Sequence, residues 1–210
     1  MPPDLDYMTY LKQILTPKRL EHSLGVRQVM GELAEVYELD KEKALTIGLL
    51  HDAGKDLSPT RRKQILAEAS IEIRHEVERN YLFYLHGPVG AYLVRKELGI
   101  TDELILGAIE THTYAGNSQN FNHPLCWCLR FADILEPNRD FRAVKRLHKG
   151  KERLRNLVYA GQMAEGAYLH SGWLLRWFEE DGLPIHPNIR RVHQDLAAQL
   201  NLDDTFLEQD

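Results

Sequence analysis

Apolar residues recur every three or four positions along most of the chain, the spacing that places side chains on one face of an α-helix. After Thr16-Pro17, for example, the apolar stripe consists of Val26, Val29, Leu33 and Val36. No segment alternates apolar and polar residues in the way that is typical of β-strands. The pattern predicts an all-α protein.

Helix-starting and helix-ending residues divide the chain into short segments. Thr16-Pro17 and Ser58-Pro59 each place a capping side chain before a proline at the first helical position. Further predicted starts are Asp40, Ser70, Gly87-Pro88, Thr101-Asp102, Pro124 and Asn188, and predicted breaks are Gly54, Gly99, Glu136-Pro137 and Gly182-Leu183-Pro184. The Asn-, Ser- and Gly-rich segment 113–123 predicts a loop, whereas 140–181 keeps the helical pattern.

The composition is that of a globular protein without a strong global charge. Of 210 residues, 43% are hydrophobic and 27% charged, and the net charge is −5, which argues against nucleic acid or an anionic membrane as the partner. No apolar run approaches the ~20 residues of a membrane span. The N-terminus lacks the features of a signal peptide, and Cys126 and Cys128 are expected to be reduced packing residues. These features predict a cytoplasmic protein of unknown oligomeric state.

Polar residues occupy inward-facing helical positions where apolar residues are expected. Counting back four positions from Val26 gives His22, and His51, His112 and Asp133 interrupt the apolar faces of three later helices. Burying such groups is costly unless they are paired or bound to a metal. A single buried histidine is usually only hydrogen-bonded, but four such positions on successive helices indicate a metal cluster inside the bundle.

The dipeptide His51-Asp52 follows an apolar helix directly and precedes Lys55 by one turn. Neighbouring helical residues point about 100° apart, so they rarely share a partner within a helix. At a helix end both side chains can turn toward one ion, and the carboxylate keeps a second oxygen free for another. The dipeptide therefore favours a metal site at the end of this helix.

The ordered set His22, His51-Asp52 and Asp133 resembles the HD-domain phosphohydrolases, which are named after the dipeptide. The finer motifs are similar to those of the YqeK-type subfamily: Arg19-x-x-His22-Ser23, Gly48-Leu49-Leu50-His51-Asp52-x-x-Lys55, His86-Gly87-Pro88-Val89-Gly90, His112-Thr113 and Ala132-Asp133-x-x-Glu136-Pro137-Asn138-Arg139. The resemblance covers residues 19–141. It implies one HD-type domain over residues 1–210, with a helical-bundle core at about 16–141 and a helical extension at about 142–210.

YqeK-type proteins are bacterial hydrolases that cut diadenosine tetraphosphate symmetrically into two ADP. The resemblance therefore implies a symmetrical bis(5'-nucleosyl)-tetraphosphatase, which acts on dinucleoside polyphosphates by means of a metal-activated hydroxide. It also implies two divalent metal ions. The first would be held by His22, His51, Asp52 and Asp133, and the second by His86 and His112, with the Asp52 carboxylate bridging the two.

The ligand types limit the choice of metal. Mixed imidazole and carboxylate ligands suit Fe, Mn, Co, Ni or Zn better than Mg, and the resemblance points to iron. Two ions ~3.5–4 Å apart lower the pKa of a shared water and hold the attacked phosphate. Besides Asp52, the expected catalytic residue is Lys55, which would neutralise charge on the phosphate chain. Expected substrate-binding residues are Arg19, Lys55, His86, Thr113, Asn138 and Arg139.

The segment after His112-Thr113 departs from the family pattern. Tyr114-Ala115-Gly116 indicates a one-residue insertion that leaves substrate preference, rather than catalysis, open. One alternative is another HD-type phosphohydrolase such as a nucleoside monophosphatase, although single-metal enzymes do not need His86 and His112. A non-catalytic HD-like nucleotide-binding module is disfavoured because all six expected ligand positions are filled. The other histidines, His170, His186 and His193 among them, are expected at the surface, with a place in the pocket lining as the alternative for His123 and His186.

Overall fold

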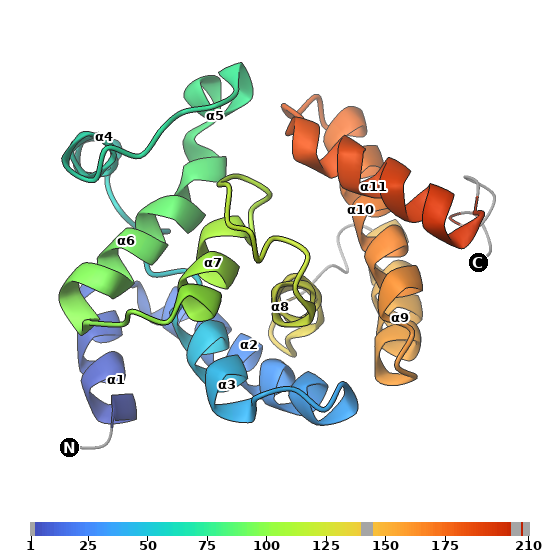
Figure 1. Ribbon diagram of the computed structural model, residues 1–210, viewed down its shortest axis with the longest axis horizontal. Helices are drawn as coiled ribbons and strands as arrows, with labels where there is room; N and C mark the ends of the chain where they lie inside the picture. The colour runs from blue at the N-terminus through green and yellow to red at the C-terminus, as the bar shows by residue number, and fades with distance from the viewer. Residues whose placement is uncertain (1–2, 140–144, 203–206, 208–210) are drawn as a thin grey trace.

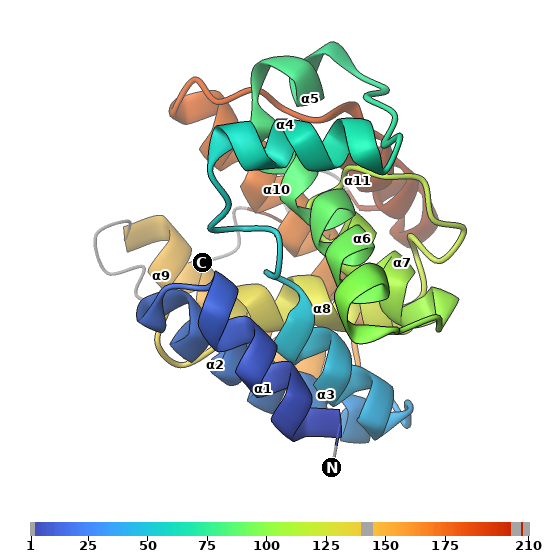
Figure 2. The same ribbon diagram turned by 90° about the vertical axis from the view of Figure 1, so that its left-hand side faces the viewer.

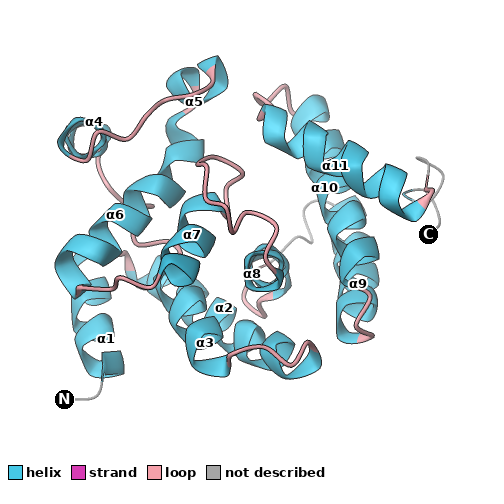
Figure 3. Cartoon of the chain, in the orientation of Figure 1, coloured by secondary structure: helices cyan, strands magenta, loops and turns pink. Residues whose placement is uncertain are grey.

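The computed structural model describes residues 3–139, 145–202 and 207, and these residues form α-helices, one 3-10 turn and no strand (Figure 3). The elements are α1 (Pro3–Ile14), α2 (Pro17–Val36), α3 (Lys41–Leu50), α4 (Pro59–Glu68), α5 (Glu76–Asn80), the 3-10 turn η1 (Leu82–Leu85), α6 (His86–Leu98), α7 (Glu103–Thr111), α8 (Pro124–Leu135), α9 (Lys145–Tyr159), α10 (Met163–Glu180) and α11 (Pro187–Leu200). The predicted all-α class is confirmed.

Most predicted helix starts are confirmed by their capping hydrogen bonds. The side chains of Thr16, Asp40 and Ser58 accept hydrogen bonds from backbone N–H groups in the first turns of α2, α3 and α4. Asp102 does the same for α7. These bonds satisfy N–H groups that have no partner within the helix. At the other end of a helix, Gly99 adopts φ 68° after α6, a left-handed conformation that glycine adopts without strain.

Two predicted starts are wrong. Ser70 has φ 51° and begins no helix, because the carboxylate of Glu78 accepts hydrogen bonds from the backbone N–H groups of Arg74 and His75 and sets the start of α5 at Glu76. Asn188 does not cap the last helix. It lies in the first turn of α11, where its N–H donates to the ring of His186, which is the residue that caps the helix.

The helices form two groups on either side of α8. Helices α2, α3 and α7 pack against one side of α8, and α9 and α10 pack against the other, with α11 covering α10 (Figure 1). Apolar residues from both groups, such as Leu33, Phe131 and Tyr168, belong to one hydrophobic core. A smaller cluster of apolar residues lies between α4 and α6, which pack together at the upper side of Figure 2. None of the described helices is long and apolar enough to cross a lipid bilayer.

Three histidines expected at the surface lie inside the protein. His170 and His193 are buried on α10 and α11, and His186 is fully buried before α11. For His170 and His193 the prediction was wrong because the charged residues around them in the sequence lie on the outer helix faces. His186 was expected at the surface as a loop residue, but it is buried because its ring pairs with the buried carboxylate of Glu78. The two cysteines are buried as expected, and burial raises the pKa of Cys126 to about 11.

Candidate active site

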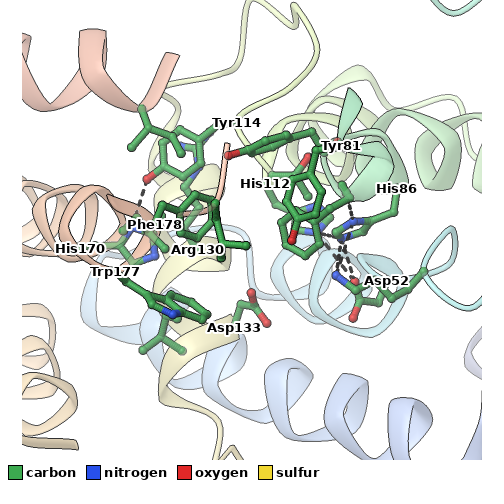
Figure 4. A pocket seen from close by; sticks show the side chains of 18 of the residues that line it. Asp52, Tyr81, His86, His112, Tyr114, Arg130, Asp133, His170, Trp177 and Phe178 are labelled. Atoms are coloured by element: carbon green, nitrogen blue, oxygen red, sulfur yellow. Dashed lines mark hydrogen bonds and ion pairs between the residues drawn. The ribbon is translucent and has the colours of Figure 1, made fainter. Parts of the chain in front are cut away.

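Six side chains from five helices or their ends meet beside α8. His22 projects from α2 and Asp133 from α8, whereas the other four lie at helix ends: His51 and Asp52 directly after α3, His86 at the start of α6 and His112 directly after α7. Figure 4 shows Asp52, His86 and His112 close together, with Asp133 facing them. The sequence motifs therefore converge in space.

Two glycines allow these helix ends to approach one another. A Cβ atom on Gly54 would lie 2.4 Å from the carbonyl oxygen of His86. A Cβ atom on Gly87 would lie 2.4 Å from the carbonyl oxygen of Glu110, near the end of α7. Both distances are far below van der Waals contact. Glycine at these two positions is what permits the turns that carry His51-Asp52, His86 and His112 to share one space.

The first group of potential metal ligands contains His22, His51, Asp52 and Asp133. The Nε2 atom of His22 is 3.7 Å from Asp52 Oδ2 and 3.0 Å from Asp133 Oδ1. The Nε2 atom of His51 is 3.5 Å from Asp52 Oδ2 and 4.0 Å from Asp133 Oδ1. With metal–ligand bonds of about 2.0–2.2 Å, the ligand atoms of one ion lie about 3 to 4 Å apart. The spacing of His22, His51 and Asp52 fits one ion, and Asp133 Oδ1 lies within 4.0 Å of both rings.

The second group contains Asp52, His86 and His112. The other oxygen of Asp52, Oδ1, is 3.2 Å from His86 Nε2 and 3.8 Å from His112 Nε2. The two histidine Nε2 atoms are 3.0 Å apart. The Asp52 carboxylate thus presents Oδ2 to one pair of histidines and Oδ1 to another. This is the arrangement expected of a carboxylate that bridges two ions.

Hydrogen bonds on the opposite side of each ring support a metal-binding role. The Nδ1 atom of His51 lies 2.9 Å from the carbonyl oxygen of Gly48. The Nδ1 atom of His86 lies 2.6 Å from the carbonyl oxygen of Phe83, and that of His112 lies 2.7 Å from the carbonyl oxygen of Ile109. A carbonyl can only accept, so each Nδ1 carries the proton and each Nε2 presents a lone pair to the cluster.

The Nε2 atoms of His86 and His112 are 3.0 Å apart, and their lone pairs repel each other unless a cation lies between them. The Nε2 atom of His51 is buried and forms no hydrogen bond within the described part of the chain, whereas His22 Nε2 lies 3.0 Å from the Asp133 carboxylate. Unpaired buried nitrogen atoms of this kind are costly. The donor set is therefore suited to divalent transition-metal ions, with imidazole and carboxylate ligands together.

The pKa of His22 is shifted in the opposite direction from the pKa values of the other three histidines. Burial alone lowers the pKa of His22, but the carboxylates of Asp133, Glu136 and Asp52 raise it to about 9. Burial and the nearby charge of Lys55 lower the pKa of His86 to about 4. Burial also lowers the pKa of His51 and His112. Three of the four rings are thus held neutral, the form in which imidazole binds a metal.

Three cationic side chains surround the cluster as expected. Arg19 Nη1 is 2.9 Å from Asp52 Oδ2, and Arg139 Nη1 contacts both the carboxylate and the backbone carbonyl of Asp133. Lys55 Nζ is 3.3 Å from His86 Nε2 and 4.1 Å from the centre of the Phe83 ring. All three line a common cavity with Asp52 and Asp133. They can therefore reach an anion bound at the cluster.

Of the two remaining expected substrate-binding residues, Thr113 lies at the cavity and Asn138 does not. Thr113 lines the cavity, and its hydroxyl donates to the carbonyl oxygen of Tyr84 at 2.6 Å. Asn138 is exposed and is not among the residues that line the cavity, although its N–H donates to the Glu136 carboxylate at 2.6 Å. The structure therefore brings Thr113, and not the side chain of Asn138, to the site.

Glu136 has no role predicted from the sequence, although it lies within one of the family motifs. Glu136 is 1% exposed, and its Oε1 lies 3.0 Å from Nδ1 of His22. A Cβ atom on Gly25 would lie 2.6 Å from Glu136 Oε2, so the glycine leaves room for this carboxylate. Glu136 orients His22 as the backbone carbonyls orient the other three rings. The contact joins residues 114 positions apart, which spacing along the chain does not reveal.

Comparison with known proteins was consistent with this geometry. The family model described as HD domain matches residues 19–138. The chain is 37% identical over 139 residues to the symmetrical bis(5'-nucleosyl)-tetraphosphatase of Bacillus subtilis, covering 66% of this chain and 72% of the relative. It is 33% identical over 141 residues to the enzyme of the same name from Halalkalibacterium halodurans, covering 65% of this chain and 71% of the relative.

A solved structure is similar over nearly the whole chain. It is a predicted HD superfamily hydrolase involved in NAD metabolism from Clostridium acetobutylicum, with a TM-score of 0.80 and 29% sequence identity. The similarity covers 92% of this chain and 96% of that one, so it includes the C-terminal helices as well as the segment matched by the family model.

Proposed function

The chain belongs to the HD domain family and, within it, to the symmetrical bis(5'-nucleosyl)-tetraphosphatases, and we propose that it hydrolyses diadenosine tetraphosphate to two ADP. It is a metal-dependent hydrolase of phosphoric anhydrides, and its substrate is a small molecule. The observation that carries the proposal is the shared carboxylate of Asp52, whose two oxygens face two separate pairs of histidines.

The proposed ligands are His22, His51, Asp52 and Asp133 for one divalent ion and Asp52, His86 and His112 for the other. Bound ions would supply an activated water and positive charge at the attacked phosphate. Iron is the proposed metal, and Mn, Co, Ni or Zn suit the same ligands. Metal analysis of protein purified without added metal tests this choice.

Residues of the chain itself orient and neutralise the substrate. Lys55 and Arg19 lie on the Asp52 side of the cavity and Arg139 on the Asp133 side. A polyphosphate that enters between them is contacted by cationic groups from both sides, which stabilises the additional negative charge of the transition state. Thr113 and His86 line the same space, whereas Asn138 does not line it.

Replacement of Arg139 by alanine is expected to lower kcat/KM for diadenosine tetraphosphate by more than ~10-fold, which corresponds to at least ~1.4 kcal/mol of transition-state stabilisation. Arg139 contacts Asp133 and lines the cavity, so its loss removes one charge from the phosphate path. Steady-state kinetics measures the effect, with Arg95→Ala, an exposed arginine paired with Glu103, as the control. Equal kinetics for both variants would make Arg139 an ordinary surface charge.

The substrate assignment is tested with a panel of dinucleoside polyphosphates and mononucleotides. We expect diadenosine tetraphosphate to be hydrolysed with a much higher kcat/KM than AMP or GMP. A nucleoside monophosphatase would show the opposite preference. Full metal content with no hydrolysis of any compound would instead support a nucleotide-binding module.

A further inference from the structure

The cavity that contains the metal cluster extends beyond it into an aromatic chamber. Its volume is about 170 Å³, and Asp52, His86 and His112 lie at one end. Figure 4 shows His170, Trp177 and Phe178 on the opposite side from Asp52 and His86. Among the described residues that line the cavity, the only carboxylates are those of Asp52 and Asp133. The cavity is thus polar at the cluster and largely apolar away from it.

The apolar wall comes from the C-terminal helices, outside the residues matched by the HD family model. Leu174, Trp177 and Phe178 project from α10, and Leu183 and Ile189 follow in and after the next loop. Tyr81, Tyr84 and Tyr114 of the core line the chamber as well. The Trp177 ring is held by a hydrogen bond from its Nε1 to Asp181 Oδ2 at 2.6 Å. The wall is therefore an oriented aromatic surface.

Hydrogen bonds fasten this wall to the core. The Tyr84 hydroxyl donates to the carbonyl oxygen of Pro184 at 2.6 Å and accepts from the N–H of His186 at 3.1 Å. The His186 ring lies 2.9 Å from the buried carboxylate of Glu78, and the Asn188 amide donates to the carbonyl oxygen of Tyr114 at 2.8 Å. These contacts join residues that are 74 to 108 positions apart in the sequence. The C-terminal helices consequently form a fixed side of the cavity.

We propose that this chamber is a nucleobase subsite and that α10 supplies the stacking surface for one adenine of the substrate. The inference rests on the proposed function, which places the phosphates at the cluster and so directs the attached nucleoside along the cavity. Flat aromatic side chains bind the faces of bases by stacking, irrespective of the base edge. An adenine in the chamber would replace water at an apolar surface while its phosphates keep their cationic partners.

One polar pair in the chamber, Tyr114 and His170, can form a hydrogen bond with the edge of the base. The Tyr114 hydroxyl lies 3.0 Å from Nδ1 of His170, and both residues line the cavity. Burial, together with the charge of Arg130, lowers the pKa of His170 to about 3, so the ring is neutral. If Tyr114 donates to Nδ1, His170 Nε2 carries a proton and can donate to a purine ring nitrogen. The segment that carries Tyr114 is the one in which the sequence departs from its family.

Calorimetric binding of ADP and of inorganic tripolyphosphate to the metal-loaded protein tests the subsite without requiring turnover. In Trp177→Ala the Kd of ADP is expected to rise about tenfold, within the range found when a base loses one aromatic stacking partner. The Kd of tripolyphosphate, which has no base, should stay at the wild-type value. Trp177→Phe keeps a flat ring and should bind ADP nearly as well as wild type.

Two results would overturn the proposal. If Trp177→Ala weakened the binding of ADP and of tripolyphosphate equally, Trp177 would act through the phosphate-binding end or through the fold. If the variant weakened the binding of neither compound, α10 would not bind the base. Photolabelling of the wild-type protein with 2-azido-ADP keeps the test valid should Trp177→Ala not fold. The expected label lies within Met163–Glu180, and labelling elsewhere alone would contradict the subsite. Failure to hydrolyse diadenosine tetraphosphate would refute the proposed function, whereas these binding experiments would still judge the subsite.

Discussion

Replacement of Asp52 by alanine is expected to remove bound metal and to lower turnover of diadenosine tetraphosphate by at least ~10³-fold, because both ions of a two-metal site lose a ligand at once. The reason is geometric: Asp52 Oδ2 lies within 3.7 Å of the first histidine pair, and Oδ1 lies within 3.8 Å of the second. No other carboxylate in the described residues faces both pairs. Metal analysis and steady-state kinetics on the same preparation measure the two effects together.

Asp56→Ala is the matched control for this experiment. Asp56 is four residues further along the chain and hydrogen-bonds to Thr16, and it does not belong to either group of potential ligands. It should keep wild-type metal content. If Asp52→Ala retained two ions per chain and near wild-type turnover, the bridging role would be wrong.

His86→Ala and His112→Ala are expected to lose one ion and keep the other, so that metal content falls from about two to about one per chain and activity falls strongly. Each variant removes one of the three proposed ligands of the second group and leaves the proposed ligands of the first, His22, His51, Asp52 and Asp133, unchanged. Stoichiometry measured by mass spectrometry of the metals distinguishes the two groups directly.

The control for the histidine variants is His123→Asn. His123 caps α8 and lies outside the cluster, and asparagine retains the capping function. This variant should bind as much metal as the wild type. Two ions per chain in both His86→Ala and His112→Ala would show that the second site has other ligands.

The helices could be predicted wherever their signals were local. Thr16, Asp40 and Ser58 each bind a backbone N–H within three residues, so the sequence alone identifies the starts of α2, α3 and α4. The sequence pattern does not predict α1, and it predicts a helix from Ser70 that begins only at Glu76. There a buried carboxylate, Glu78, caps the backbone from within α5, a role that helix periodicity does not reveal.

The sequence predicts which residues form the cluster, but it does not predict which other side chains contact them or line the cavity. His22, His51, His112 and Asp133 interrupt apolar helix faces, which is a visible anomaly in the sequence. The contact between Glu136 and His22 depends instead on how α2 meets the end of α8. The position of Trp177 in the cavity likewise depends on the packing of α10 across α8, since several faces of an aromatic-rich helix can satisfy the same pattern.

The position of the cleaved bond tests the central proposal most directly. Diadenosine tetraphosphate is incubated with the metal-loaded protein in ¹⁸O-labelled water. The nucleotides are then separated by chromatography, and mass spectrometry measures the ¹⁸O content of each. Attack at an inner phosphate with ADP as the leaving group predicts ADP as the sole nucleotide product, with one ¹⁸O atom in one ADP of each pair. AMP and ATP as the main products would contradict the account, because they require cleavage of the anhydride bond between an outer and an inner phosphate.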